Sequence, residues 1–444
     1  MKMDFDTKYY EFILSISYGN FLDSIDGTNK VILAHKSMLE SVGISQVHIF
    51  PRSIRFPLTN KIVTKYWGVT IDGRVLNQVY THDEVIQRLV QITMNKKNLK
   101  EVHIHHLLYV NMEELEKILN VFMVPIKFYL HDYYTICLQF NLLKDNDVYC
   151  GKGAVSQKKC AECKYYLKSK EHYAKIKKFL NEYGNRMHFI APSKAAKEIW
   201  SSAFPDYEAS ATVIYHQSLL ESYCENCEII PDEEPIKIAY VGSKRINKGW
   251  KQWENAIRKS YELGCNEKYY HFGSTNDKIQ YVEKIPVFFT SDNINAMVNA
   301  LRVNNIDVVV LWSIWPETYS YTYYESTAAN TFIITNKYSG NIAAMVLERN
   351  NGVVLDSEAE FIELICDEKR LRKLVNEFKS SKNYGPLNLI ENRKLLQLLS
   401  KEKEHNDFKI QISKDSLFLA LTRQMITFLF TLQKIREEVK RWLR

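Results

Sequence analysis

Apolar runs rich in Val, Ile, Tyr and Phe alternate along most of the chain with segments of helical spacing. The first half predicts strands at 10–16, 46–50, 101–106, 125–132, 187–193 and 211–216, and helices at 27–43, 112–120 and 194–200. The second half predicts strands at 236–242, 268–273 and 307–312, helices at 251–264, 292–302 and 321–330, and closing segments at 331–336, 341–348 and 352–356. This alternation favours parallel sheets with helices on both faces.

The alternation runs through two series of roughly 200 residues each, which predicts an α/β protein with two doubly wound domains. A chain of 444 residues also exceeds what one core commonly supports. The segment 222–235 is polar and acidic and holds two prolines, so it marks the boundary. The predicted units are 1–221, 222–387 and 388–444.

Two segments fall outside the alternation. Residues 132–165 form an insertion that contains four cysteines and runs into a lysine-rich helix at 158–180. Residues 388–444 are predicted to be a helical extension with a basic end, whose apolar part packs on the N-terminal domain. Each segment has two interpretations: a solvated or packed face, or a contact with an anionic membrane surface.

Composition narrows the class of protein. Apolar residues make up 46% and charged residues 25%, as in a soluble globular protein, and the net charge of +7 suits anionic ligands or an anionic membrane surface. The excess is too diffuse to indicate nucleic-acid binding. The N-terminus has no secretory apolar region, and the apolar run 417–432 is broken by Arg423 and Gln424. We therefore expect a cytoplasmic protein whose cysteines are thiols or metal ligands.

A basic loop follows the predicted strand 236–242, where ligands of open α/β sheets commonly bind. Gly242 ends the strand, and Lys244, Arg245 and Lys248 then precede a helix. Cations before a helix N-terminus suit a phosphate group. The alternative is a solvated basic loop, and this stretch alone does not decide between the two.

A pair of glutamates surrounds the next strand-to-helix turn. Glu317 falls on the loop, Ser320 is placed to cap the helix, and Glu325 falls on its second turn. Backbone amides near Ser320 to Thr322 would face an anion. Carboxylates at this position can accept hydrogen bonds from the vicinal hydroxyls of a ribose or a hexose.

The first half offers two further candidates. His131 and Asp132 end a predicted strand, where the histidine either contacts a sugar or pairs with the aspartate. Gly27 and Thr28 begin a helix after the first strand, and Gly27 permits close approach of a ligand to the backbone. The absence of a Gly-x-Gly-x-x-Gly pattern argues against a dinucleotide site. Most of the histidines at 103, 105 and 106 are expected in the core or at its rim.

The cysteines allow a structural zinc site. Cys137, Cys150, Cys160 and Cys163 would supply four thiolates, with Cys160 and Cys163 in a C-x2-C pair. Cys224 and Cys227 form a second such pair and could share a site. The alternative is a set of free buried thiols.

These motifs together resemble the family-4 glycosyltransferases, retaining enzymes of the GT-B fold. The likeness covers most of residues 10–370, and its most specific part is 307–345, with a Glu-x7-Glu motif at Glu317 and Glu325. The family often has Glu-Gly-Phe-Gly where this chain has Glu-Thr-Tyr-Ser, and an arginine where this chain has Ser243. The stretch from His131, followed by C-x2-C, resembles a subgroup that assembles bacterial surface polysaccharides.

The resemblance implies two Rossmann-like domains that face a central cleft, with 1–221 on the acceptor side and 222–387 binding a nucleotide sugar. It implies that Glu325 binds the ribose, Glu317 faces the transferred sugar, and Lys248, with Arg245 or Lys244, holds the diphosphate. The implied catalytic residues are His131, Glu317, Lys248 and Arg245. The implied substrate-binding residues are Glu325, Gly27, Thr28, Asp132, Gly242, Lys244, Gly273, Tyr319, Ser320, Tyr321 and Thr322.

The implied activity is hexosyl transfer from a nucleotide-diphosphate sugar to a glycan, a lipid-linked glycan or a protein, without a cofactor or a catalytic metal. Two alternatives stay open. One is a non-catalytic GT-B partner subunit that binds glycan or a sister enzyme, and the other is an enzyme like the sugar-nucleotide 2-epimerases. The presence of Lys248, Glu317 and Glu325 counts against a partner subunit, which tends to lose such residues.

Overall fold

The computed structural model describes residues 5–24, 26–55, 62–221, 229–231, 233–273, 280–289, 293, 295–385 and 387–399. These residues form two compact units. The first holds the residues up to 131 together with 181–190 and 393–399, and the second holds 132–180 and 191–392. The predicted domain limits at 221 and 387 stay predictions, and much of the predicted boundary segment lies outside the described residues.

The first unit is built on a mixed sheet with strand order β10-β7-β6-β1-β2-β3-β4, in which β5 also pairs with β3. Its strands are β1 (Glu11–Ile16), β2 (Ile44–Arg55), β3 (Ile62–Ile71), β4 (Arg74–Val75), β5 (Tyr80–Thr81), β6 (Asn98–Ile104), β7 (Ile126–Tyr129) and β10 (Met187–Ala191). Its helices are α1 (Gly27–Glu40), α2 (His82–Met94) and α3 (Met112–Val121). The strands from β10 to β2 pair in parallel, as the alternation predicts, and β3 continues the sheet in antiparallel pairing, with β4 and β5 on its outer side.

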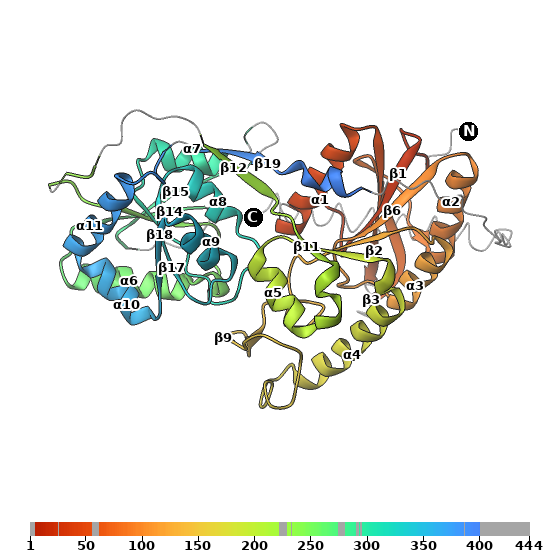
Figure 1. Cartoon of the computed structure of the whole chain (residues 1–444), viewed down its shortest axis with the longest axis horizontal. Helices are drawn as coiled ribbons and strands as arrows, with labels where there is room; N and C mark the ends of the chain where they lie inside the picture. The colour runs from red at the N-terminus through yellow and green to blue at the C-terminus, as the bar shows by residue number, and fades with distance from the viewer. Residues whose placement is uncertain are drawn as a thin grey trace. The chain divides into compact units, whose positions relative to one another are not determined.

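The second unit is built on a parallel sheet, drawn in green to blue in Figure 1. Its strand order is β15-β14-β13-β16-β17-β18. Its strands are β13 (Lys237–Val241), β14 (Lys268–Phe272), β15 (Val282–Ile285), β16 (Val308–Val310), β17 (Phe332–Asn336) and β18 (Gly352–Leu355). Its helices are α6 (Trp250–Glu262), α7 (Ala296–Val303), α8 (Tyr321–Ala328), α9 (Asn341–Arg349), α10 (Glu358–Cys366) and α11 (Glu368–Lys379).

Successive residues of β13 face opposite sides of this sheet. Ile238 and Tyr240 pack in one core with side chains of α6, α10 and α11, whereas Ala239 and Val241 pack in the other with α7, α8 and α9. Because both faces are covered, the strands are continuously apolar rather than alternating. This confirms the predicted α/β class with doubly wound sheets.

The remaining elements lie outside the two main sheets or lengthen them. They are β8 (Leu143–Lys144), β9 (Val148–Tyr149), α4 (Tyr166–Tyr183), α5 (Lys194–Ala203), β11 (Ala211–Val213), β12 (Gln217–Glu221), β19 (Leu387–Glu391) and the 3-10 helices Gly184–Arg186, Pro205–Ser210, Ile246–Lys248 and Arg393–Leu398. At the start of the predicted helical extension, β19 instead pairs antiparallel with β12. Residues 400–444 of that extension lie outside the described residues. None of the helices that the structure describes has the length and apolar character needed to cross a membrane.

Candidate active site

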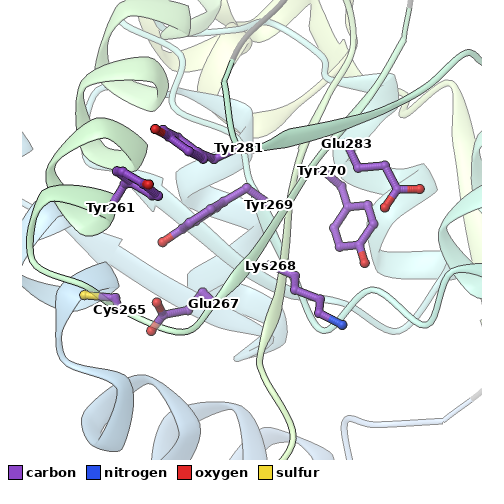
Figure 2. A pocket seen from close by; sticks show the side chains of 8 residues that line it. All are labelled: Tyr261, Cys265, Glu267, Lys268, Tyr269, Tyr270, Tyr281 and Glu283. Atoms are coloured by element: carbon purple, nitrogen blue, oxygen red, sulfur yellow. The ribbon is translucent and has the colours of Figure 1, made fainter.

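A cavity of about 220 Å³ lies where β14 begins (Figure 2). Its lining consists of Tyr261, Cys265, Glu267, Lys268, Tyr269, Tyr270, Tyr281 and Glu283. This is the amino end of the strand, whereas ligands of open α/β sheets bind at the carboxyl ends. We therefore place the candidate active site at the carboxyl ends of the strands of this sheet.

At these carboxyl ends, the loops after β13 and β14 contact each other through two glycines. The Gly242 amide donates to the carbonyl of Phe272 at 2.8 Å, and Gly242 and Gly273 have positive φ angles of 109° and 153°. A Cβ atom on Gly273 would lie 2.5 Å from the Gly242 oxygen, so only glycine fits there. Both glycines stand where the sequence predicts substrate contacts.

The basic loop after β13 is fixed to the loop after β16. The carbonyl of Asn247 accepts hydrogen bonds from the Ser313 hydroxyl at 3.2 Å and the Ile314 amide at 3.1 Å. Gly249 then turns the chain into α6 with a φ of 79°, and a Cβ atom there would lie 1.9 Å from the Trp312 oxygen. The backbone of the loop that carries Lys248 is therefore fixed on both sides of the lysine, at Asn247 and at Gly249.

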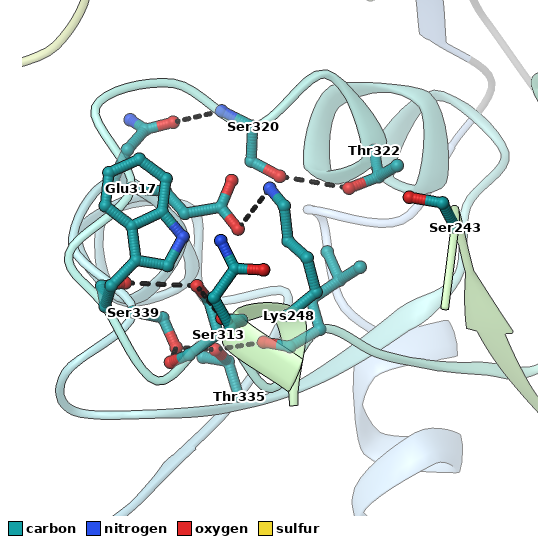
Figure 3. A network of polar contacts seen from close by, with 12 residues as sticks. Ser243, Lys248, Ser313, Glu317, Ser320, Thr322, Thr335 and Ser339 are labelled. Atoms are coloured by element: carbon teal, nitrogen blue, oxygen red, sulfur yellow. Dashed lines mark hydrogen bonds and ion pairs between the residues drawn. The ribbon is translucent and has the colours of Figure 1, made fainter. Parts of the chain in front are cut away.

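Lys248 and Glu317 form an ion pair across these two loops, with Lys248 Nζ at 2.6 Å from Glu317 Oε1 (Figure 3). The Glu317 side chain is 2% exposed, whereas that of Lys248 is 36% exposed. Within the described part of the chain, Glu317 Oε2 is buried and has no hydrogen-bond partner. The pair thus presents one cation and one unused carboxylate oxygen at the carboxyl end of β16.

The backbone around Glu317 is pinned by the turn after β17. The Asn341 amide donates to the Glu317 carbonyl at 2.8 Å, and Gly340 forms a β-bridge with Glu317. Gly340 has a φ of 62°, and a Cβ atom there would lie 2.5 Å from the Pro316 carbonyl carbon. The glycine turn therefore fixes the position of Glu317, a role that the sequence alone does not show.

Ser320 precedes the first residue of α8, where the sequence places it. Its hydroxyl makes no cap hydrogen bond, however, and instead lies 3.0 Å from the Thr322 hydroxyl, while its amide donates to Asn341 Oδ1 at 3.4 Å. The expected side-chain cap is therefore wrong, because the two hydroxyls pair with each other. The first N–H groups of a helix lack partners within the helix, so this end favours an anion.

Glu325 lies on the second turn of α8, as expected, and is 4% exposed. Burial, and then the charge of Glu325, raises the pKa of Tyr321 well above its ordinary value. Asn330, where the predicted helix ends, has a positive φ of 62°, a left-handed conformation that asparagine tolerates.

Tyr319, one of the predicted substrate-binding residues, also packs against other side chains of the second unit. Its hydroxyl accepts from the Gln217 amide at 3.1 Å and donates to Gln217 Oε1 at 3.3 Å. Its ring stacks on that of Tyr324, with ring centroids 4.6 Å apart. The side chain of Tyr319 is therefore held within the second unit by stacking and by two hydrogen bonds to Gln217.

The other two cations of the basic loop are exposed. Lys244 Nζ lies 5.3 Å from the centroid of the Trp250 ring, a cation–π arrangement. Arg245 precedes the 3-10 helix. Burial raises the pKa of Tyr240 above its ordinary value, and the nearby charge of Arg245 opposes this shift. Both are placed on the same short loop as Lys248.

The candidates of the first unit lie at the carboxyl ends of its own strands. Asp26 caps α1 by accepting from the Asn29 amide at 3.0 Å, and next to it no atom lies within 4 Å of where a Cβ atom on Gly27 would be. Thr28 follows on the first turn. His131, after β7, lies with its Nε2 atom 3.0 Å from His105 Nδ1.

Asp132 is the first residue of the second unit. Its Oδ1 atom accepts from the Tyr134 amide at 2.8 Å.

The four cysteines of the insertion are half-buried. Burial raises the pKa of Cys137 and, to about 11, that of Cys150, and the charges of Cys160 and Cys163 raise both further. Cys137 Sγ lies 3.3 Å from the Ser169 hydroxyl. Among the residues that the structure describes, three histidines bring metal-ligating atoms close together, whereas these four cysteines do not. The zinc site therefore stays a prediction, and Cys224 and Cys227 lie outside the described residues.

No family model matches the sequence, and no curated protein sequence does either. Several solved structures are similar in fold at low sequence identity. Sucrose-phosphate synthase from Thermosynechococcus elongatus is 12% identical, with 83% of this chain and 93% of that chain covered and a TM-score of 0.48. Anabaena HepE in complex with UDP-glucose is 11% identical, with 84% and 95% covered and a TM-score of 0.45. A variant of S. aureus TarM in complex with fondaparinux, α-GlcNAc-glycerol and UDP is 10% identical, with 83% and 95% covered and a TM-score of 0.47.

Proposed function

We propose that this chain is a retaining glycosyltransferase of the GT-B type that uses a nucleotide-diphosphate sugar. The observation that carries the proposal is the pair of Lys248 and Glu317. A buried carboxylate oxygen without a partner suits a donor such as a sugar hydroxyl, and the lysine beside it suits a phosphate. The family-4 motif, read from the sequence, supports the same roles.

In this proposal the diphosphate lies between the basic loop and the N-terminus of α8. Lys248, with Arg245 or Lys244, and the amides of Ser320 to Thr322 supply positive charge without a metal ion. Glu325 accepts from the ribose hydroxyls, and Glu317 Oε2 accepts from a hydroxyl of the transferred sugar.

The transfer breaks the bond between the anomeric carbon and the phosphate oxygen, and the electron pair of that bond goes to the diphosphate. An acceptor hydroxyl forms the new bond on the same face of the sugar, and its proton passes to the leaving phosphate oxygen. The configuration at the anomeric carbon is therefore retained. The positive charges at Lys248 and α8 stabilise the negative charge that develops on the leaving group.

The acceptor is proposed to be a glycan or a lipid-linked glycan of a surface polysaccharide. The cytoplasmic location and the contact of 158–180 or the C-terminal extension with anionic lipid stay predictions. Sedimentation with anionic and with neutral vesicles tests the lipid contact, and equal recovery with both would count against it.

A thermal-shift screen against UDP, GDP, dTDP and CMP and their common sugars tests the proposed function. We expect one base to raise the melting temperature and Glu325→Gln to remove that shift. Glu254→Gln is the matched control, because Glu254 is an exposed residue on α6. If no nucleotide binds the folded protein, the result favours the non-catalytic partner subunit. If a sugar nucleotide is isomerised without transfer, the result favours the epimerase.

A further inference from the structure

Three buried histidines meet in the first unit, on elements that lie far apart in the sequence. His35 lies on α1, His103 lies on β6, and His105 follows β6 directly. One ligand atom from each of the three rings lies within 4.8 Å of the other two. The group therefore joins a helix to the sheet that it covers.

Two of these rings have an unused nitrogen. In the part of the chain that the structure describes, His35 Nδ1 and His105 Nε2 are buried without a hydrogen-bond partner. His35 is 7% exposed and His105 is 1% exposed. Burying a polar atom without a hydrogen-bond partner costs free energy. A ligand that bonds to these two nitrogens would therefore stabilise the folded protein.

Both nitrogens of His103 and the second nitrogen of His105 have polar partners, as metal-binding histidines commonly do. His103 Nε2 lies 2.9 Å from Glu101 Oε2, so this nitrogen carries the proton and donates it to the carboxylate. The His103 Nδ1 lone pair then accepts from the Tyr129 hydroxyl at 3.1 Å. His105 Nδ1 lies 3.0 Å from His131 Nε2. These contacts fix the orientation of two of the three rings.

A metal ion needs a lone pair on each ring, and the buried, unpartnered nitrogens of His35 and His105 are placed to supply one each. Imidazole nitrogens suit zinc, copper, nickel and cobalt ions.

We propose that His35, His103 and His105 bind one divalent transition-metal ion, with zinc as the first candidate. Zinc–nitrogen bonds of about 2.0–2.1 Å place two ligand nitrogens roughly 3.4 Å apart in a tetrahedral site, so the rings close in around the ion. His103 exchanges its hydrogen bond with Tyr129 for the ion, and water or the Tyr129 oxygen takes the fourth position. The ion crosslinks α1 to β6 and, through His105, orients His131. This inference does not depend on the proposed function.

Metal analysis of the full chain, purified after removal of any affinity tag, tests the proposal. Elemental analysis is expected to show one zinc ion per chain, and cobalt substitution is expected to give visible ligand-field bands without thiolate-to-metal charge-transfer bands. His35→Gln and His105→Gln are expected to lose the ion, and Glu101→Gln to weaken its binding by about 10–100-fold. Circular dichroism checks that each variant folds.

Cys160→Ser combined with Cys163→Ser is the matched control, because the cysteines of the insertion are the other candidate ligands. This variant is expected to keep one ion per chain. A folded wild-type protein that binds neither zinc nor cobalt overturns the proposal. So does an ion that survives in both histidine variants, or one that the cysteine variant loses with charge-transfer bands in the wild-type spectrum.

Discussion

Lys248 Nζ lies 2.6 Å from Glu317 Oε1, so the loops after β13 and β16 are joined by an ion pair whose carboxylate is buried and whose lysine is partly exposed. The lysine compensates the charge that Glu317 brings into the protein, while Glu317 Oε2 is left without a partner among the described residues. The ion pair therefore stabilises the buried carboxylate of Glu317 and leaves its Oε2 atom able to accept a hydrogen bond from a ligand.

Removing the lysine should destabilise the second unit. Lys248→Met keeps the length of the side chain but leaves a buried carboxylate without its cation, and we expect a loss of about 1–3 kcal/mol. The loss is smaller than for a fully buried pair because Lys248 is 36% exposed. Urea unfolding measures it, with Lys251→Met, an exposed lysine on α6, as the control.

A second substitution should restore part of that stability. In the Lys248→Met background, Glu317→Gln removes the unpaired charge and keeps the shape of the side chain, so the double variant should be more stable than Lys248→Met alone. A double-mutant cycle by urea unfolding measures the coupling, expected at about 0.5–3 kcal/mol. Strictly additive effects would show that the two side chains do not interact in solution.

Gly249→Ala should be more destabilising than Gly264→Ala. Both glycines have positive φ angles, 79° and 70°, but a Cβ atom on Gly249 would lie 1.9 Å from the Trp312 oxygen, whereas Gly264 has open space. The backbone strain alone costs about 1 kcal/mol, and the clash adds to it. Thermal unfolding of the two variants separates the terms, and equal losses would contradict the close contact of the two loops.

Stability should fall as the pH is lowered below about 6.5. Burial lowers the pKa of His48 to about 4, whereas an unfolded histidine titrates near 6.5. Between these values the unfolded state binds a proton that the folded state does not, so the free energy of unfolding decreases with falling pH. His48→Gln should reduce the slope by about 1.4 kcal/mol per pH unit in that window. An unchanged slope in urea unfolding across the pH series would mean that His48 titrates normally.

Much of the second unit could be predicted from the sequence, because its strands are short apolar runs between turn residues. The predicted strands 236–242 and 307–312 contain β13 and β16, and the predicted helix 251–264 covers α6 except for its first residue, Trp250. The antiparallel strand β3 and the helix α2 are not predicted by the alternation. The strand β19 lies at the start of the predicted helical extension, where Leu387 is buried and Leu389 is half-buried while Asn388 and Ile390 are exposed.

The candidate residues could be predicted singly, but their contacts could not. Lys248 and Glu317 follow different strands, and only the strand order β13-β16 brings their loops together. The requirement for glycine at Gly249 and Gly340 comes from backbone atoms of other loops, which no local pattern reveals. Serine is a residue type preferred at the N-cap, but the Ser320 hydroxyl pairs with the nearby Thr322 hydroxyl instead of a helix amide.

The most direct test of a retaining transfer at this site is an NMR measurement of the first sugar released from the donor that the nucleotide screen identifies, whether by transfer or by hydrolysis. We expect a product with the same anomeric configuration as the donor, formed by the wild-type protein and by Lys251→Met but not by Lys248→Met. An inverted product would contradict the retaining mechanism. Equal turnover by the folded Lys248→Met variant would contradict the assignment of the site.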